Sequence, residues 1–166
     1  MLNAKIEKAL NRQINQEMAA AYNYYAMAAH FEHQNLAGFA AWMKIQRSEE
    51  LVHAERLFQY VLDRGGRIDL DAVGKPRMDY KNVLEVFEAA LKTERDNTDS
   101  INELYTQARE LNDYATLSHL QWFLDEQVEE EKTFDEAIAL LKMAGDDRSA
   151  LLMLNEKFGS RAPEAK

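Results

Sequence analysis

The sequence predicts an all-α protein: a four-helix up-down bundle with one long crossover and a short fifth helix at its C-terminal end. Only two prolines and six glycines interrupt the 166 residues. The long segments between them space apolar residues alternately three and four apart, as in a helix that buries one stripe. Residues 65–80, GGRIDLDAVGKPRMDY, are too polar and broken for a helix and supply the crossover. Helices of about 30 residues are about 45 Å long, which suits a bundle rather than an array of short repeats.

Local signals set the helix boundaries within a single domain that spans residues 1–166. Asn3 can cap the first helix, and Gly65 with the glycine after it ends the second. Asp146 or Asp147 can cap the fifth helix, which Gly159 closes. The predicted helices span about residues 4–34, 36–64, 81–111, 115–143 and 147–158.

Composition narrows the classes of function. Apolar residues make up 46% and charged residues 30%, as in an ordinary globular chain, and the absence of cysteine excludes disulfides, thiolate metal sites and iron–sulfur clusters. The net charge of −9 argues against nucleic acid and anionic membranes as partners and is compatible with a cation as ligand. No segment has the apolar length of a membrane span and no apolar signal core begins the chain, so a cytoplasmic location is the default expectation.

Each of the four long helices carries an acidic residue in the middle of its apolar stripe. These residues are Glu17, Glu50, Glu94 and Glu130, and His53 follows Glu50 one turn later on the same side. A lone buried carboxylate costs several kcal/mol unless something compensates its charge. Four acids at matching depth are not explained as solvated surface, and they indicate a cation in the core.

An internal repeat relates the two halves of the chain. A shift of 77 residues converts Glu17, Glu50 and His53 into Glu94, Gln127 and Glu130. Two hairpins related by a pseudo-twofold axis would bring all of these residues together. Carboxylate-bridged di-iron bundles use one Glu from each of two helices and Glu-x-x-His from each of the other two. The first half matches this pattern and the second half has Gln127-x-x-Glu130 instead, so we expect two unequal metal positions.

The expected ligands, four carboxylates and one imidazole, are mostly hard oxygen donors. They favour iron or manganese over structural zinc, which prefers Cys and His in a closed tetrahedron. A pair of divalent cations would supply the positive charge that makes the buried carboxylates tolerable.

Four stretches carry a resemblance to a known family: NQEMAAAYNYY, RSEELVHAERLFQY, KTERD and LQWFLDEQVEEEKTF. In order and spacing they resemble the bacterial non-haem ferritins, of the ferritin-like di-iron carboxylate family, over nearly the whole chain. The resemblance implies a homo-oligomeric cage of 24 chains. It also implies that the cage oxidises Fe(II) with O2 or H2O2 at an intra-subunit di-iron ferroxidase centre and stores ferric mineral inside.

The resemblance further implies a role for each candidate ligand. The first iron would be held by Glu17, Glu50 and His53, with Glu50 as the bridge between the two irons. The second iron would be held by Glu94 and Glu130 together with the shared Glu50.

Other site residues match the family around this iron pair. Gln127 would hydrogen-bond beside the irons, and Tyr24 matches the tyrosine next to the di-iron centre, although it can also be a core residue. An additional iron site would use Glu49, Glu126 and Glu129. Because Glu126 and Glu129 flank the apolar stripe, they can instead be acids of the inner surface.

Two other interpretations remain from the sequence. A haem-containing, bacterioferritin-like di-iron oxidase would have a histidine at Glu130 and a methionine at Leu51, so we expect no haem. A metal-free structural or interaction bundle would turn its inner acids towards a partner or a wet cavity.

Two segments outside the four long helices predict contacts of their own. Residues 67–73, RIDLDAV, alternate apolar and polar side chains with the period of a strand, so we expect them to pair antiparallel with the same segment of a neighbouring chain. The short terminal helix carries more apolar surface than a lone helix can shelter. We expect it to pack against the end of the bundle or against copies of itself at a symmetry axis.

Overall fold

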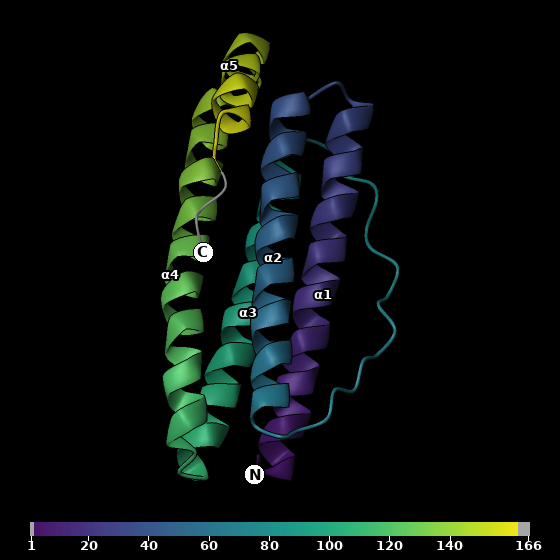
Figure 1. Cartoon of the computed structure of the whole chain (residues 1–166). Coiled ribbons are helices and arrows are strands. Elements are labelled where there is room, and N and C mark those ends of the chain that lie inside the picture. Colours follow the sequence, from purple (N-terminus) through teal and green to yellow (C-terminus); the bar gives the residue numbers. More distant parts are fainter. Residues whose placement is uncertain (1, 163–166) are drawn as a thin grey trace.

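A computed structural model of the chain describes residues 2–162 and contains helices but no strand in that range. The helices are α1 (Ala4–His33), α2 (Ala37–Asp63), α3 (Val83–Glu110), α4 (Tyr114–Ala144) and α5 (Arg148–Gly159) (Figure 1). The predicted all-α fold class is confirmed. Each helix begins and ends within two residues of the range expected from the sequence.

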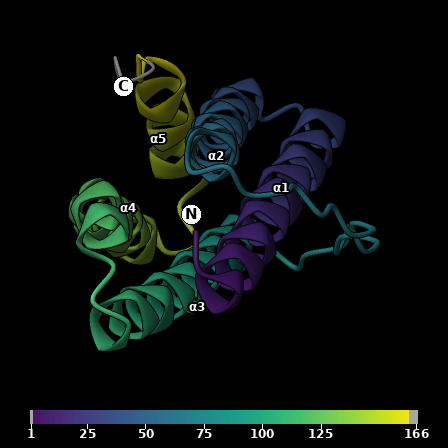
Figure 2. The same cartoon turned by 60° about the horizontal axis from the view of Figure 1, so that its bottom comes forward.

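The helices form two antiparallel hairpins that pack against each other. α1 pairs with α2 and α3 pairs with α4, and α1 also contacts α3. The crossover runs along the outside of α1 from the end of α2 to the start of α3 (Figure 1). Figure 2 shows α1 to α4 around a common axis, with α5 lying outside them beside α2. None of the described helices is both long and apolar enough to cross a membrane.

Short polar side chains begin four of the five helices. Each accepts a hydrogen bond from a backbone N–H two or three residues further on, and so satisfies an amide that the helix itself leaves unpaired. These N-cap residues are Asn3, Asn82, Asp113 and Asp147. Of the two aspartates that the sequence offers before α5, the structure therefore uses Asp147.

The core is divided into two apolar clusters by a polar layer. One cluster lies towards α5 and includes Tyr24, Phe87 and Phe134, and the other lies at the opposite end and includes Ile14 and Phe123. The layer between them holds buried polar side chains from all four long helices: Gln13, Glu17, Gln46, Glu50, His53, Glu94, Asn97, Gln127 and Glu130. The acids expected in the apolar stripes therefore lie in a layer that is closed by apolar packing on both sides.

Two asparagines of α1 hold the first part of the crossover in an extended conformation. Asn11 donates to Arg67 O at 2.8 Å and accepts from Asp69 N at 2.8 Å. One turn later, Asn15 donates to Asp69 O at 3.0 Å and accepts from Asp71 N at 2.9 Å. The match arises because four helical residues rise about 6 Å and two strand residues about 6.6 Å. In an extended chain, the N–H and C=O groups of successive residues point to opposite sides. Those of residues 68, 70 and 72 therefore point away from the asparagines of α1. The antiparallel contact with a neighbouring chain stays a prediction.

α5 packs against the end of the bundle, on α2 and α4, which is one of the two arrangements expected from the sequence. Phe158 is 7% exposed, and its ring lies 5.4 Å from that of Phe39 and 5.5 Å from that of Phe87. The backbones of α5 and α2 touch at two glycines, since a Cβ on Gly159 would lie 2.8 Å from Gly38 Cα. α5 therefore completes one apolar cluster of the core.

Phe158→Ala should destabilise the protein by about 3–5 kcal/mol, because it removes a buried ring and leaves a cavity. Leu152→Ala on the same helix is the matched control, since Leu152 is 57% exposed, and it should cost less than about 1 kcal/mol. Denaturant unfolding of both variants measures the difference. Equal losses would show that α5 is not part of the core.

Candidate metal centre

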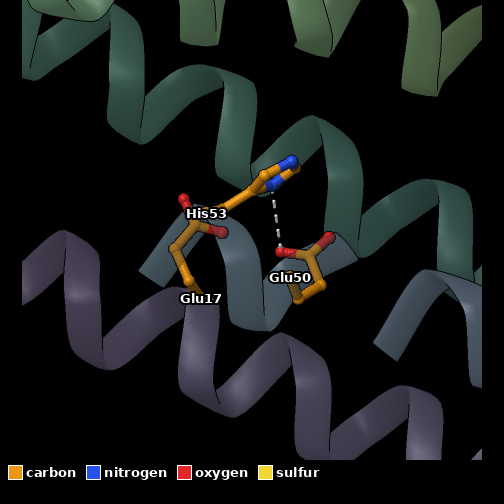
Figure 3. A group of neighbouring side chains, drawn as sticks. All are labelled: Glu17, Glu50 and His53. Atoms are coloured by element: carbon orange, nitrogen blue, oxygen red, sulfur yellow. Dashed lines mark ion pairs between the residues drawn. The ribbon is translucent and has the colours of Figure 1, made fainter. Parts of the chain in front are cut away.

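Glu17, Glu50 and His53 converge in the polar layer. All three are fully buried, and each offers one ligand atom such that these atoms lie within 4.8 Å of one another. Figure 3 shows Glu17 reaching from α1 towards Glu50 and His53 on α2. Nδ1 of His53 lies 3.6 Å from Glu50 Oε2, since residues three apart share one face of a helix. Two carboxylates and an imidazole at this spacing can ligate one divalent cation.

Glu50 is distinct from the other acids because no hydrogen-bond donor within residues 2–162 reaches either of its oxygens. Burial raises the pKa of Glu50 well above its usual value, and the negative charges of Glu94 and Glu17 raise it further. A carboxylate that is buried without donors is strongly unfavourable when ionised. It needs either a proton or a cation.

Two carboxamides and a hydroxyl fix the orientation of Glu17. Gln13 donates to Glu17 Oε1 at 2.8 Å, and Asn97 donates to Glu17 Oε2 at 3.0 Å. Gln13 also donates to Asn97 Oδ1, and Ser100 donates to Gln13 Oε1 at 2.6 Å. Because both oxygens of Glu17 accept a hydrogen bond, its carboxylate is held in one orientation before a metal binds.

Glu94 is held by Tyr24 and Gln127. The hydroxyl of Tyr24 donates to Glu94 Oε1, and Gln127 Nε2 lies 3.3 Å from Glu94 Oε2, 3.2 Å from Glu94 O and 3.2 Å from Thr98 Oγ1. Burial and then the charge of Glu130 raise the pKa of Glu94 to about 8. Burial and Glu94 also raise the pKa of Tyr24. Tyr24 therefore contacts a predicted iron ligand, as well as packing in the core.

A second possible cation cluster lies on the other side of the imidazole. His53, Glu126 and Glu130 offer ligand atoms within 4.8 Å of one another, and His53 Nε2 is 3.9 Å from Glu126 Oε2. Gln46 donates to Glu130 Oε2 at 2.8 Å. Glu94 belongs to neither cluster formed by residues 2–162, so its sharing of a second iron with Glu130 stays a prediction.

The acids expected at an additional iron site occupy different surroundings. Glu126 is half-buried beside His53, Glu129 is exposed, and Glu49 is buried against the guanidinium of Arg161. Within residues 2–162, neither Glu49 nor Glu129 joins a cluster of potential metal ligands.

Several residues at this centre had no role in the sequence interpretation. Gln13 lies one turn before Glu17, Gln46 one turn before Glu50, and Asn97 one turn after Glu94. A polar residue one turn from a buried acid was thus an available signal. Arg161 had no such signal, because it contacts residues more than 100 positions away along the chain.

Residues 7–144 match the family described as a ferritin-like domain. The chain belongs to the ferritin family. This finding confirms the resemblance to the bacterial non-haem ferritins that the sequence motifs indicate.

Similarity to known ferritins extends over nearly the whole chain. It is 40% identical over 161 residues to the bacterial non-heme ferritin of Staphylococcus aureus (strain USA300), covering 97% of each chain. It is 41% identical over 162 residues to that of Staphylococcus epidermidis, covering 98% of each chain.

Solved structures of an archaeal ferritin are similar in fold. An engineered closed form of the Archaeoglobus fulgidus ferritin matches with a TM-score of 0.97 and 40% identity, over 99% of this chain and 100% of that chain. The open pore ferritin from the same archaeon matches with a TM-score of 0.96 and 40% identity, over 98% and 100%.

The raised pKa of Glu94 predicts a pH dependence of stability in the metal-free protein. The folded carboxyl releases its proton near pH 8 and the unfolded one near 4.5, so this contribution to stability is complete below about 4.5 and is lost as the pH rises through about 8. Glu94→Gln is neutral at every pH and keeps an acceptor for Tyr24. Its thermal midpoint should exceed that of the parent by at least about 3 °C more at pH 9 than at pH 5.

Scanning calorimetry of both metal-free proteins measures this difference. Glu136→Gln, which alters an exposed acid on α4, is the control and should show the same difference from the parent at both pH values. If Glu94→Gln also differed from the parent by the same amount at pH 5 and pH 9, the raised pKa of Glu94 would be contradicted.

Proposed function

We propose that this ferritin oxidises Fe(II) to Fe(III) at a centre that includes Glu17, Glu50 and His53, and stores the ferric product. The observation that carries the proposal is Glu50, which is fully buried, has no hydrogen-bond donor among residues 2–162 and faces two further ligands. Cations on both sides of this carboxylate would satisfy both oxygens. Membership of the ferritin family supports iron storage.

Binding of Fe(II) competes with protons for the same carboxylates. Burial raises the pKa of Glu50 above its usual value and that of Glu94 to about 8, which strengthens this competition. The hydrogen bonds to Glu17 and Glu94 hold these ligands in position, and the apolar clusters on either side exclude bulk water. In the reaction, two Fe(II) ions give up one electron each. The two electrons reduce O2 with two protons to H2O2, or reduce H2O2 with two protons to two waters.

The proposal assigns the second iron to Glu94 and Glu130, with Glu50 shared. The negative charge of Glu130, which raises the pKa of Glu94, supports this assignment, because a cation bound by both carboxylates would relieve their repulsion. Gln127 donates hydrogen bonds to Glu94 and carries no charge, so it cannot supply a second charged bridge. The second position should therefore hold iron less tightly than the first.

We further propose that copies of the chain assemble into a cage of 24 subunits. The similarity to ferritins over nearly the whole chain supports an oligomer. The exposed Leu70 of the crossover, whose flanking backbone is already held by Asn15, supports a contact between subunits along this segment. A cytoplasmic location and the choice between O2 and H2O2 stay predictions.

Anaerobic titration with Fe(II), followed by addition of oxidant, tests the proposed centre. The parent should bind two Fe(II) per chain and form ferric absorbance within seconds of oxidant addition. Glu50→Gln keeps the shape of the side chain but removes the bridging charge. Loss of a residue that only hydrogen-bonds to a metal ligand already lowers metal affinity or activity by about 10–100-fold. This variant should therefore slow iron oxidation by at least about tenfold.

Glu136→Gln, on the exposed face of α4, is the matched control and should oxidise iron at the parent rate. Absence of stoichiometric uptake by the parent would favour the metal-free bundle. Equal rates for Glu50→Gln and the parent would place oxidation elsewhere.

The double variant Gln127→Glu and Glu130→His restores the symmetric repeat. It should retain both irons through repeated turnovers and mineralise iron more slowly, because a second charged bridge and an imidazole strengthen the weaker position. Metal analysis after repeated cycles of iron and oxidant measures retention. Equal occupancy and equal release in parent and variant would show that the asymmetry has no such role.

A further inference from the structure

The segment after α5 brings Arg161 to the edge of the metal centre. Phe158 anchors the end of α5 in the core, and the N–H of Arg161 donates to Phe158 O at 3.2 Å. Further along the helix, Asn155 Oδ1 accepts a hydrogen bond from Phe39 N at 3.0 Å, which ties α5 to the start of α2. The position of Arg161 therefore follows from the docking of α5 rather than from local sequence.

Three residues of α2 hold the guanidinium of Arg161. One nitrogen lies 3.4 Å and 3.3 Å from the two oxygens of Glu49, and the other donates to Gln46 Oε1. The guanidinium carbon lies 5.2 Å from the centre of the Trp42 ring, within the range of a cation–π contact. Only 16% of the Arg161 side chain and 5% of the Glu49 side chain are exposed. This is a built site for a cation, and the protein fills it with its own arginine.

The same arginine also acts on Glu130 through Gln46. Because Arg161 donates to Gln46 Oε1, the amide must turn its Nε2 the other way, and that nitrogen donates to Glu130 Oε2 at 2.8 Å. A predicted iron ligand on α4 is thus oriented by a residue that follows α5.

We propose that Arg161 serves as a built-in cation for Glu49, and that a metal ion can use Glu49 only when Arg161 is displaced. Glu49 is the carboxylate next to the bridging Glu50 in the sequence, and it faces a guanidinium where the family resemblance predicts a third iron. One guanidinium nitrogen lies 3.3–3.4 Å from both oxygens of Glu49, so a metal ion that binds these oxygens has to displace it. The parent should therefore bind a third ion weakly. This inference rests on the proposed ferroxidase function and concerns what limits its metal capacity.

Arg161→Gln removes the charge while keeping a polar side chain. Anaerobic calorimetric titration with Fe(II) should then show a third equivalent per chain that binds at least about tenfold more tightly than in the parent. Arg161→Lys, which keeps the charge, should behave like the parent. Lys157→Gln, which removes a charge from α5 itself, is the matched control and should leave the titration unchanged.

A second change identifies the ligand. Adding Glu49→Gln to Arg161→Gln should abolish the gained equivalent, because the released carboxylate is then absent. If the substitution disturbs folding, a chain ending at Ser160 removes Arg161 while it keeps all of α5, and it should gain the same equivalent.

The outcomes separate this inference from the proposed function. Equal metal number and affinity in the parent and Arg161→Gln would overturn the role of Arg161, as would a gained equivalent that survives Glu49→Gln. A parent that binds fewer than two Fe(II) would overturn the proposed function instead. Whatever the number of Fe(II) ions that the parent binds, the role of Arg161 is tested by the difference in bound Fe(II) between the parent and Arg161→Gln.

Discussion

The charge buried at the middle of the bundle is the constraint on which the rest of the structure depends. Glu17, Glu50, Glu94 and Glu130 are each at most 3% exposed, and they lie in one layer between two apolar clusters. Ionised carboxylates in such a place cost several kcal/mol each without a compensating charge. The raised pKa values of Glu50 and Glu94 express this cost in the metal-free protein. A layer that destabilises the empty protein is the same layer that gains most from a bound cation.

Neutral amide side chains orient the carboxylates of this layer without neutralising their charge. Gln13 and Asn97 donate to Glu17, Gln127 donates to Glu94, and Gln46 donates to Glu130. An amide fixes the direction of a carboxylate and leaves its charge available to a metal, whereas a lysine or arginine would supply that charge permanently. Glu50 receives no donor within the described chain, which leaves both of its oxygens available for metal ions.

Arg161 is the exception, because it places a permanent charge on Glu49 at the edge of the layer. The bundle therefore treats its inner acids in two ways: those oriented by amides or left without donors are available to metal ions, and Glu49 is held by a cation from the chain itself. The docking of α5 is what permits this division. Phe158 and the contact between Gly38 and Gly159 hold α5 on the bundle, and Arg161 follows directly.

The sequence by itself determined the helices, their boundaries within two residues, the buried acids and the asymmetry between His53 and Glu130, because helical periodicity, caps and repeats are local properties. Tertiary structure alone decided which side chains from other parts of the chain meet each acid. Gln13 contacts Asn97 across 84 residues, and Arg161 contacts Glu49 across 112. Such pairs depend on how the hairpins and α5 pack, and no spacing along one helix encodes that packing. The same reason explains why Glu49 reads as a metal ligand in the sequence and lies against an arginine in the fold.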